Sequence, residues 1–521
     1  MENKCCLIVL DGWGYNETKS PDITDGVLLA NPKTMRSLCN TYYSTLLYAH
    51  GTYVGLLSDN EMGNSEVGHL TLGSGRVIVQ DSVRIRNTLA GDSSSIAAKL
   101  FPSAIDSVHI FGILSDGGIH GHWHNIRDIA IIASKYCKRV YVHSVSDGRD
   151  TQPEMYLTYL DAFIESVPDN VWIVSVSGRF YAMDRDKRNE RTDAYFNAIT
   201  TPTTNSIAEN IDKEKCIEGI RAHIASSYSQ GVSDEFIEPV CFAGWIENTS
   251  SVIITNFRAD RIRQIYSKFS QYTVTYTMTR LYNDQDGSRV LFERPSISDA
   301  LGDIIEEKGM RQVRIAESEK QAHVTFFFDG GKDKSRKNQQ IIIHPSKKVS
   351  TFDLAPEMEA SLVSQSIQNS MEEGIDFILA NFANCDMVGH TGLVEPTVAA
   401  VKAVDEQIHN IYTAAKKYNY NLIITADHGN AEIMKNKDGI VKSHSKNRVP
   451  LIVIQNTQFQ DTLATTADDF FFKQSHNYSL KDVAPTILDI MQIEKPDSMT
   501  GQSLMASLHT NSNKLDEHCT K

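Results

Sequence analysis

The chain has 521 residues, 41% of them hydrophobic and 22% charged, which excludes a mainly disordered or fibrous protein and allows several hydrophobic cores. Its 51 Lys and Arg against 65 Asp and Glu give a net charge of −14, which disfavours a nucleic-acid binder unless one face concentrates positive charge. A small anionic substrate is still compatible with this net charge, because a local cluster of arginines can outweigh the negative electrostatic field of the whole protein. At about 150 residues per domain, the length predicts two large domains or three smaller ones.

The eight cysteines are scattered and form no Cys-x-x-Cys pair, so neither a disulfide framework nor a zinc knuckle is predicted. They are typical of reduced, mostly buried thiols in the cytoplasm. Apolar stretches such as 5–10 are much shorter than the ~20 residues that a membrane span needs. That stretch also runs directly into Asp11 without a cleavage site, so it is not a signal peptide. We therefore expect a soluble cytoplasmic protein without a membrane segment.

Short apolar runs rich in β-branched residues predict buried strands. A helical pattern is clearest over 394–415, where apolar residues recur every three or four positions and Pro396 falls in the first turn; a shorter one covers 125–135. Buried parallel strands separated by helices predict an α/β fold. In chain order the predicted strands cover 5–10, 108–114, 140–145, 171–176, 252–255, 324–328, 377–382, 422–425 and 451–454.

Polar clusters follow most of these strands. Open α/β sheets bind ligands beyond the carboxyl ends of their strands, so the clusters are candidate active-site loops. One such cluster alone is better explained as an ordinary turn, because Asp and Gly favour turns. Seven clusters, most of them containing His or Arg, favour a site. They cover 11–14, 115–120, 146–150, 177–179, 256–261, 384–390 and 426–430.

Several carboxylates and imidazoles have the spacing of metal ligands. Asp386 and His390 are four residues apart and can face one ion, while Asp427 and His428 are adjacent at a strand end. With Asp11 and His444 they make three carboxylates and three imidazoles, a set that suits Mn²⁺, Zn²⁺ or Co²⁺ better than Ca²⁺. Any single Asp–His pair is better explained by a structural histidine; the complete set indicates two metal ions.

The segment 61–69 places Ser65 in a glycine-flanked loop. A serine hydroxyl becomes a good nucleophile only when a base or a metal ion lowers its pKa. The spacing also fits a helix N-cap, because Ser65 precedes Glu66 and an apolar residue. On spacing alone, the N-cap is the stronger interpretation.

Nine motifs run in order along the chain. They are Asp11-Gly-Trp-Gly, Met62-Gly-Asn-Ser-Glu-Val-Gly-His69, Leu114-Ser-Asp-Gly-Gly-Ile-His120, Asp147-Gly-Arg-Asp150, Gly178-Arg-Phe-Tyr-Ala-Met-Asp-Arg185, Asn256-Phe-Arg-Ala-Asp-Arg261, Glu317-Ser-Glu-Lys320, Asp386-Met-Val-Gly-His390 and Ala426-Asp-His-Gly-Asn430. Together they resemble the motifs of the cofactor-independent (2,3-bisphosphoglycerate-independent) phosphoglycerate mutases, in the alkaline phosphatase superfamily. The resemblance runs from residue 11 to about 450 and so covers nearly the whole chain.

The resemblance implies a role for each matched residue. Ser65 is expected to be the nucleophile that becomes phosphoserine, with Lys320 beside it and the transferring phosphoryl group. Two Mn²⁺ ions are expected, with Co²⁺ or Zn²⁺ as alternatives: one held by Asp386, His390 and His444, the other by Asp11, Asp427, His428 and Ser65. The residues expected to bind phosphoglycerate are His120, Arg149, Asp150, Arg179, Arg185, Arg258, Arg261 and Lys320. Arginine forks match carboxylate and phosphate groups, and Asp150 is a candidate acid or base for the substrate hydroxyls.

The ligand positions also predict the domain layout. Asp11 and Ser65 must lie beside residues 386–444 at one pair of metal ions. The chain between residue 65 and residue 386 must therefore leave this domain and later return to it. We expect a discontinuous metal-binding domain, an alkaline-phosphatase-like doubly wound sheet over 1–75 and 312–521, with a second α/β domain over 76–311 that binds substrate. Each domain brings half of the expected site, so closure is expected to exclude water and favour transfer over hydrolysis.

The predicted function is the interconversion of 3-phosphoglycerate and 2-phosphoglycerate by a monomer that binds neither nucleic acid nor membrane. Two alternatives remain open. One is another enzyme of the superfamily, either a phosphatase or a mutase for a sugar phosphate. The other is a metal-dependent binding or scaffold protein that has kept the fold and lost turnover.

Overall fold

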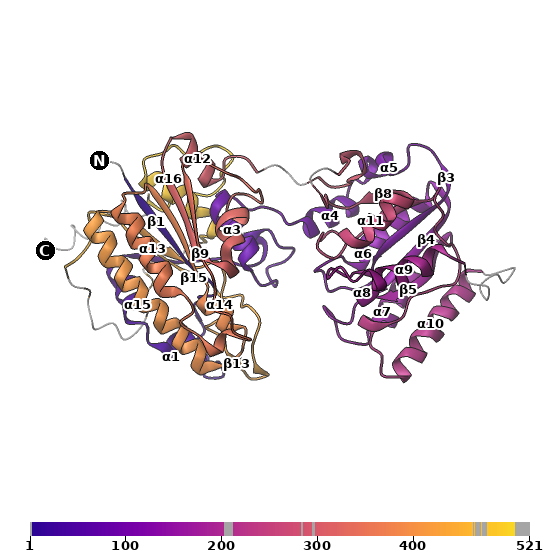
Figure 1. Ribbon diagram of the computed structural model, residues 1–521, viewed down its shortest axis with the longest axis horizontal. Coiled ribbons are helices and arrows are strands. Elements are labelled where there is room, and N and C mark those ends of the chain that lie inside the picture. The colour runs from indigo at the N-terminus through magenta and orange to yellow at the C-terminus, as the bar shows by residue number, and fades with distance from the viewer. Residues whose placement is uncertain are drawn as a thin grey trace. The chain divides into compact units, whose positions relative to one another are not determined.

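The computed structural model describes residues 3–505 except 203–211, 283–284, 294–296, 462, 464–469, 471 and 473–476. Its chain divides into two compact units (Figure 1). Unit 1 comprises Met1–Gln80 and Ser296–Lys521, and unit 2 comprises Asp81–Pro295. The first and last parts of the chain therefore share one unit, and the middle forms the other.

Unit 1 is built on a seven-stranded mixed sheet in the order β10-β9-β11-β1-β12-β15-β2. β15 is antiparallel to both of its neighbours, and the remaining pairs are parallel. The central strands are buried along their whole length, which explains their continuous apolar sequences. The strands are β1 (Cys5–Leu10), β2 (Tyr43–Leu47), β9 (Gln312–Glu317), β10 (Gln339–His344), β11 (Phe377–Phe382), β12 (Asn421–Thr425) and β15 (Val449–Ile454); β13 (Lys435–Asn436) and β14 (Gly439–Ile440) form a separate hairpin.

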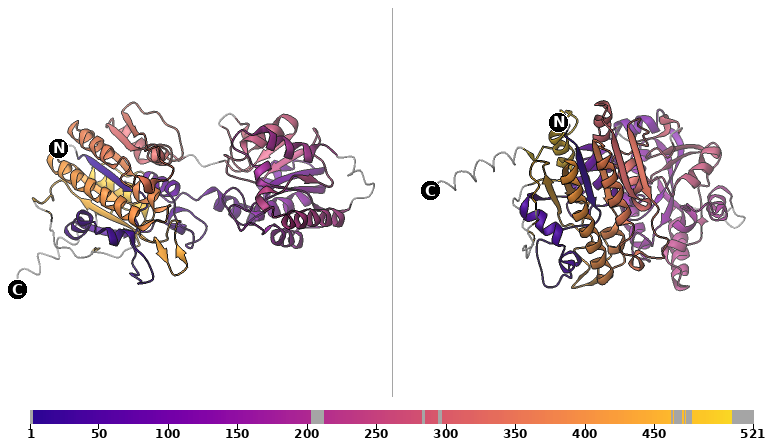
Figure 2. Two further views of the ribbon diagram at one scale, coloured as in Figure 1. Left: turned by 60° about the horizontal axis from the view of Figure 1, so that its bottom comes forward. Right: turned by 60° about the vertical axis from the view of Figure 1, so that its left-hand side comes forward.

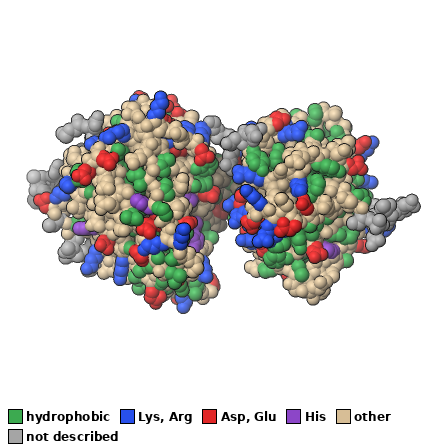
Figure 3. Space-filling model, in the orientation of Figure 1, with side chains coloured by type: hydrophobic (Ala, Val, Ile, Leu, Met, Phe, Trp, Pro, Cys, Tyr) green, Lys and Arg blue, Asp and Glu red, His purple; other side chains and the backbone are tan. Residues whose placement is uncertain are grey.

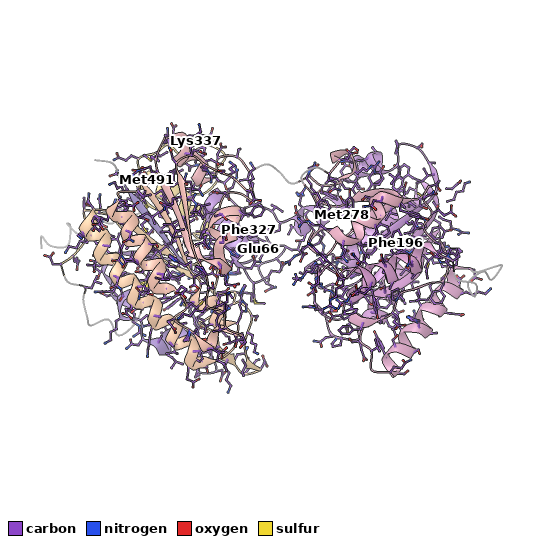
Figure 4. All side chains as sticks on the ribbon, in the orientation of Figure 1. Glu66, Phe196, Met278, Phe327, Lys337 and Met491 are labelled. Carbon is purple, nitrogen blue, oxygen red and sulfur yellow. The ribbon has the colours of Figure 1, made fainter. Side chains whose placement is uncertain are left out.

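Helices cover both faces of this sheet (Figures 1 and 2). α13 (Ala360–Glu372) and α15 (Val394–Tyr418) pack together on one face, and α3 (Ser65–Ser74), α12 (Leu301–Glu307) and α16 (Val483–Ile490) pack on the other. The π-helix at His323–Phe327 lies against α3, as the labelled Phe327 and Glu66 show in Figure 4. The other α-helices among the described residues of unit 1 are α1 (Gly26–Ala30), α2 (Lys33–Thr41) and α14 (Asn384–Gly389).

Unit 2 has its own six-stranded sheet, in the order β6-β5-β4-β3-β7-β8, parallel except for β6. Two hydrophobic clusters cover its faces, one formed with α4, α5, α6, α7 and α10 and the other with α8, α9 and α11. The strands are β3 (Ile105–Ile113), β4 (Cys137–Ser146), β5 (Val171–Gly178), β6 (Val240–Cys241), β7 (Ser251–Ile254) and β8 (Val274–Thr277); the helices are α4 (Asp81–Ala90), α5 (Ser94–Leu100), α6 (Trp123–Ser134), α7 (Tyr156–Ser166), α8 (Arg179–Ala182), α9 (Asn189–Thr200), α10 (Lys213–Ser229) and α11 (Arg263–Tyr272).

The predicted α/β class is confirmed, and eight of the nine predicted strands are present. The exception is 324–328, which the structure shows as a π-helix followed by Phe328. A short apolar run can be buried in a strand or in a helical turn, and its composition does not decide between them. The predicted ranges do not include β2, β6, β8, β9 and β10 or the short hairpin strands β13 and β14. β10 is a half-exposed edge strand, which weakens the apolar signal.

The second boundary between the units lies before α12, whereas the sequence placed it after this helix. Leu301 and Ile305 of α12 are fully buried in the core of unit 1, which ties the helix to that unit. The seven cysteines among the described residues are buried and form no disulfide, as expected, and Cys519 lies outside the described residues.

Candidate active site

Four neighbouring strands of unit 1 end beside one another and carry most of the predicted metal-site residues. β9, β11, β1 and β12 are adjacent and parallel, and Leu10 pairs with Phe382 at the carboxyl ends of β1 and β11. Asp11 follows β1 directly, and α14, which contains Asp386, follows β11. Asp427 and His428 follow β12 after a single alanine. Adjacent parallel strands thus bring residues far apart in sequence to one edge of the sheet.

Ser65 is the first residue of α3, and its hydroxyl is not the helix cap. The side chain of Asn64 accepts the capping hydrogen bond from Val67 N at 3.1 Å. Gly63 and Gly68 permit close approaches, because a Cβ on either would lie within 2.7 Å of a backbone oxygen, that of Ala49 or of Asp427. The N-cap interpretation of Ser65 is therefore wrong, and its hydroxyl is available for another role.

The Ser65 hydroxyl lies among three charged or titratable groups. Its Oγ is 2.8 Å from Lys320 Nζ, 3.0 Å from His428 Nε2 and 3.1 Å from Asp11 Oδ1. Ser65 is 7% exposed, and the other three side chains are buried more deeply. The sequence prediction that Lys320 lies beside Ser65 agrees with this geometry.

Two groups of ligand atoms close enough to share a metal ion are present among the described residues. One group is Asp386, His428 and His444, and the other is Asp11, Asp427 and His428; within each, the ligand atoms lie within 4.8 Å of one another. His390 joins the first group, with Nε2 3.2 Å from Asp386 Oδ1 and 3.0 Å from His444 Nε2. His428 belongs to both groups, whereas the sequence assigned it to the Asp11 set alone.

The electrostatics of this region favour a bound cation. Burial opposes the ionisation of Asp11 and Asp386, but the ammonium of Lys320 and the neighbouring histidines together outweigh it and hold their pKa values below the usual range. Burial also opposes the charge on Lys320, yet Asp11, Asp386 and Asp427 hold its pKa above the usual range. Three carboxylates therefore face the ammonium of Lys320 and the ring of His428, whose pKa is also raised, and this leaves a negative excess in a buried site.

Individual side chains in this region also show that a cation would be stabilised here. Asp427 Oδ2 is buried and accepts no hydrogen bond from the described residues; His69 Nδ1 lies 3.3 Å away, but it is paired with the Ser65 carbonyl oxygen. Burial lowers the pKa of His428, but Asp427 and the neighbouring carboxylates reverse this and raise it to about 9. The ring nitrogens of His390 and His444 point at the same carboxylate oxygen. This donor set fits divalent metal ions.

Buried polar residues that the sequence analysis did not assign hold the ligand loops in place. Glu432 is fully buried, and its Oε2 accepts hydrogen bonds from the backbone nitrogens of Gly14 (3.2 Å) and Asn430 (2.9 Å). Its Oε1 accepts from Ser445 Oγ and from Asn447 Nδ2. These partners lie in the loops that carry Asp11, His428 and His444. Only the position of Glu432, four residues after His428, could have suggested this role.

Asn381 and His69 support Asp11 from the other side. Asn381 Nδ2 donates to Asp11 Oδ2 at 2.8 Å and lies 3.0 Å from His69 Nε2. His69 Nδ1 is in turn 2.9 Å from the backbone oxygen of Ser65, one turn earlier in α3. The last residue of the Met62–His69 motif therefore links the serine-bearing turn to the carboxylate of β1.

Unit 2 gathers the predicted substrate residues around a buried arginine. Arg179 is 2% exposed, and its Nη1 donates to Asp147 Oδ1 and Asp150 Oδ2, both at 2.6 Å. Asp147 also accepts from Ser115 Oγ and from the backbone nitrogens of 149 and 150. Asp147 thus orders the turn that presents Arg149 and Asp150, a role that the sequence analysis did not assign to it.

Asp260 organises a second group of predicted substrate residues. Its carboxylate lies 3.1 Å from Arg185 Nη1, 3.2 Å from Arg258 Nε and 3.6 Å from His120 Nδ1. Burial raises the pKa of Asp260, but Arg258 and His120 outweigh it and bring the pKa below its usual value. Burial and then Arg179 lower the pKa of His120 to about 4, so this imidazole is neutral near pH 7. The sequence analysis quoted Asp260 within a motif but gave it no role.

Arg149 and Arg261 complete the cluster. Arg149 is half exposed and pairs with Glu235, with Nη1 3.2 Å from Oε1. Burial, followed by the nearby Arg179, Arg185 and Arg149, lowers the pKa of Arg261, which shows how densely positive charge is packed here. All seven substrate residues predicted in unit 2 thus fall within one region, the arginine cluster: His120, Arg149, Asp150, Arg179, Arg185, Arg258 and Arg261.

Comparison with known proteins identifies the family. The Metalloenzyme superfamily model matches residues 3–495. A 2,3-bisphosphoglycerate-independent phosphoglycerate mutase of Aliarcobacter butzleri is 37% identical over 514 residues, covering 96% of this chain and 99% of that protein. The chain belongs to the 2,3-bisphosphoglycerate-independent phosphoglycerate mutases. The mutase of Bacteroides thetaiotaomicron is also 38% identical, over 97% of this chain and 100% of that protein.

A solved structure of the same enzyme type supports the fold. The Leishmania mexicana phosphoglycerate mutase, determined at low cobalt concentration, superposes with a TM-score of 0.66 and 25% identity over 96% of this chain and 97% of that one. The family and the isomerase class expected from the motifs are confirmed, and phosphoglycerate is the substrate class that membership implies. Among the helices of the described residues, none has the length and apolar character that a membrane crossing requires.

Proposed function

We propose that this phosphoglycerate mutase interconverts 3-phosphoglycerate and 2-phosphoglycerate through a phosphoserine formed on Ser65. The observation that carries the proposal is the position of Ser65 Oγ, within 3.1 Å of Lys320, His428 and Asp11 and beside both groups of ligand atoms. Ser65 Oγ would react as the alkoxide, its proton having been released to solvent, a form that bound divalent ions would favour. In the forward step the bond between phosphorus and the substrate oxygen breaks as the bond to Ser65 Oγ forms, and the return step leaves Oγ as the alkoxide again. The second step returns the phosphoryl group to the other hydroxyl of the glycerate.

Two divalent ions are part of this proposal, Mn²⁺ being our choice and Co²⁺ or Zn²⁺ the alternatives. Asp386, His390 and His444 would hold one ion, and Asp11, Asp427, His428 and Ser65 would hold the other. When bound, such ions supply positive charge that lowers the pKa of a nearby hydroxyl and neutralises phosphoryl oxygens. The buried Asp427 Oδ2, which accepts no hydrogen bond from the described residues, and the excess of carboxylates over ammonium groups support this assignment.

Lys320 has an electrostatic role in the proposed reaction. The neighbouring carboxylates of Asp11, Asp386 and Asp427 raise its pKa above the usual range, which favours the protonated ammonium. Its ammonium donates to Ser65 Oγ, Asp11 and Asp386, which orients the hydroxyl and offsets charge when the phosphoryl group arrives. In phosphoryl transfer most of the catalysis is positioning and charge neutralisation of this kind.

Unit 2 is proposed to bind the glycerate part and to handle its protons. The arginine cluster offers planar forks for a carboxylate and a phosphate, and the neutral His120 can donate or accept a hydrogen bond at a hydroxyl. Asp150, held by Arg179 at 2.6 Å, is the proposed acid and base. It gives a proton to the substrate oxygen that loses the phosphoryl group and takes one from the hydroxyl that receives it.

We propose a cytoplasmic monomer whose unit 1 carries the metal centre and whose unit 2 carries the substrate arginines. The arginine cluster argues against a simple phosphatase, because an enzyme that only hydrolyses the phosphate does not need to bind the carboxylate of the glycerate. A phosphate-release assay distinguishes the two: a phosphatase would release inorganic phosphate from 3-phosphoglycerate as its main product. A coupled enolase assay addresses the scaffold alternative, which predicts binding without turnover.

The phosphoserine itself can be mapped directly. Incubation with 3-phosphoglycerate labelled in its phosphoryl group, followed by an acid quench and peptide mass spectrometry, should place the label on Ser65. Ser74, a buried serine on the same helix whose Oγ donates to Arg76 O, serves as the internal control and should stay unlabelled. Label on another residue, or no label during steady turnover, would contradict the mechanism.

The Glu432→Gln substitution should weaken metal binding roughly 10–100-fold, the usual cost of losing an outer-shell partner. An amide has one acceptor oxygen, so its NH₂ group would face two of the four donors that now converge on the carboxylate. Competition against a chromophoric chelator measures the affinity. Asp405→Asn is the control, because Asp405 is a buried carboxylate that caps α2 through Thr34 and Met35. Equal affinities in the two variants would count against this role for Glu432.

A further inference from the structure

Unit 2 contains a cavity of about 550 Å³ next to the arginine cluster. This volume is within the range of small-molecule sites, roughly 300–1,000 Å³. Its charged and aromatic lining comes from Arg185, Lys187, Asp260, Arg263, Lys268 and Tyr282. Apart from Arg185, none of these residues belongs to the predicted substrate set. Lys and Arg side chains gather along one edge of this unit in Figure 3.

The lining has a marked excess of positive charge: four cationic side chains against the single carboxylate of Asp260. Two of the four already have ionic partners, since Arg185 pairs with Asp260 and Lys268 with Asp193. Lys187 forms no ion pair with any residue that the structure describes. Its backbone has φ 59°, in the left-handed region that a lysine adopts only when its surroundings require it.

Arg263 is fixed in an orientation that presents its guanidinium to the cavity wall. Its Nε donates to the Leu281 carbonyl oxygen at 2.9 Å, and its guanidinium carbon lies 5.6 Å from the centre of the Tyr282 ring. The Tyr282 hydroxyl donates back to the Arg263 carbonyl oxygen at 3.3 Å. A guanidinium held in this way loses little freedom when it binds an anion.

We propose that this cavity is a second anion site, for a small molecule that carries two acidic groups, at least one of them a phosphate or phosphonate. Lys187 and Lys268 supply point charges for one group, and Arg263 supplies a planar fork for the other. Arg185 is shared with the arginine cluster, so an anion in the cavity competes with Asp260 for this side chain. Binding of an anion in the cavity is therefore coupled to the substrate residues through Arg185. This coupling rests on the proposed function, whereas the anion site itself does not.

Phosphonoacetate is a suitable probe, since it has a phosphonate and a carboxylate and resists hydrolysis. Calorimetric titration of the metal-loaded enzyme should show binding that weakens at least tenfold in the double variant Lys187→Gln/Lys268→Gln. Lys138→Gln is the matched control, because Lys138 is an exposed lysine of unit 2 that pairs with Asp106. The control should bind phosphonoacetate as the wild type does, and the KM for 3-phosphoglycerate should stay unchanged in the double variant.

Two results would overturn the inference. Unchanged affinity in the double variant would mean that phosphonoacetate occupies the substrate arginines only. A KM that rises by the same factor as the phosphonoacetate dissociation constant would place the two lysines in the substrate site. A third result would separate the two proposals. If the wild-type enzyme showed no mutase turnover but its binding of phosphonoacetate still depended on Lys187 and Lys268, the proposed function would be contradicted and the anion site would not.

Discussion

The Ser65→Ala variant is expected to lose mutase activity by roughly 10⁴-fold or more, as enzymes do when a covalent nucleophile is removed. The hydroxyl is the only group of Ser65 that reaches Lys320, His428 and Asp11, and alanine has no atom to replace it. The fold should be retained, because Asn64 and not Ser65 caps α3 and alanine favours a helical position. The coupled enolase assay measures the loss, and thermal unfolding checks that the melting temperature shifts by only a few degrees.

Ser74→Ala provides the comparison for this experiment. Ser74 is a fully buried serine at the other end of α3, and its Oγ donates to the Arg76 carbonyl oxygen rather than to any ligand residue. This variant should keep near-normal turnover at some cost in stability. Substantial activity in Ser65→Ala would end the phosphoserine mechanism, whatever the behaviour of Ser74→Ala.

Removal of divalent metal should abolish activity completely, and Mn²⁺ should restore it. The reason is the charge on the buried site: the three carboxylates of Asp11, Asp386 and Asp427 outnumber their cationic neighbours, the ammonium of Lys320 and the ring of His428. A phosphate brought into this site without metal would meet three carboxylates, and the repulsion would prevent transfer. Dialysis against EDTA, elemental analysis and the coupled assay test this, with Co²⁺ and Zn²⁺ compared as replacements.

Metal removal should also lower the melting temperature, because ligands that bind only the native state stabilise it by mass action. A titration back with Mn²⁺ should raise activity and melting temperature together. Full turnover by protein that elemental analysis shows to be free of metal would contradict the proposed metal centre. Recovery of stability without activity would indicate that a bound ion is structural.

The central part of the site could be predicted because its residues follow strands. Asp11, Asp386 and Asp427 each come soon after a buried apolar run, and parallel strands bring such positions to one edge of a sheet. The spacing of Asp386 and His390 matched the short helix α14. The family motifs then added Ser65 and Lys320 to the predicted site. Spacing alone could not show that these two residues lie side by side, because they are far apart in the sequence.

Other features depend on tertiary contacts that leave no local pattern. Glu432 and Asp260 are acidic residues in loops, and only their neighbours in space show that each holds several donors. The run 324–328 has strand-like composition, but it packs as a helical segment against α3. Asn64 and Ser65 are both good capping residues, and the choice between them is made by the geometry around Gly63 and Gly68.

The buried ammonium of Lys320 has a consequence for how the enzyme matures. Its ammonium bridges Asp11 and Asp386 and acts as an internal counter-ion. It therefore reduces the repulsion between the two carboxylates even when no metal ion is bound. We therefore expect that the polypeptide can fold before it is metallated, with Lys320 in place of an outside cation between these two carboxylates.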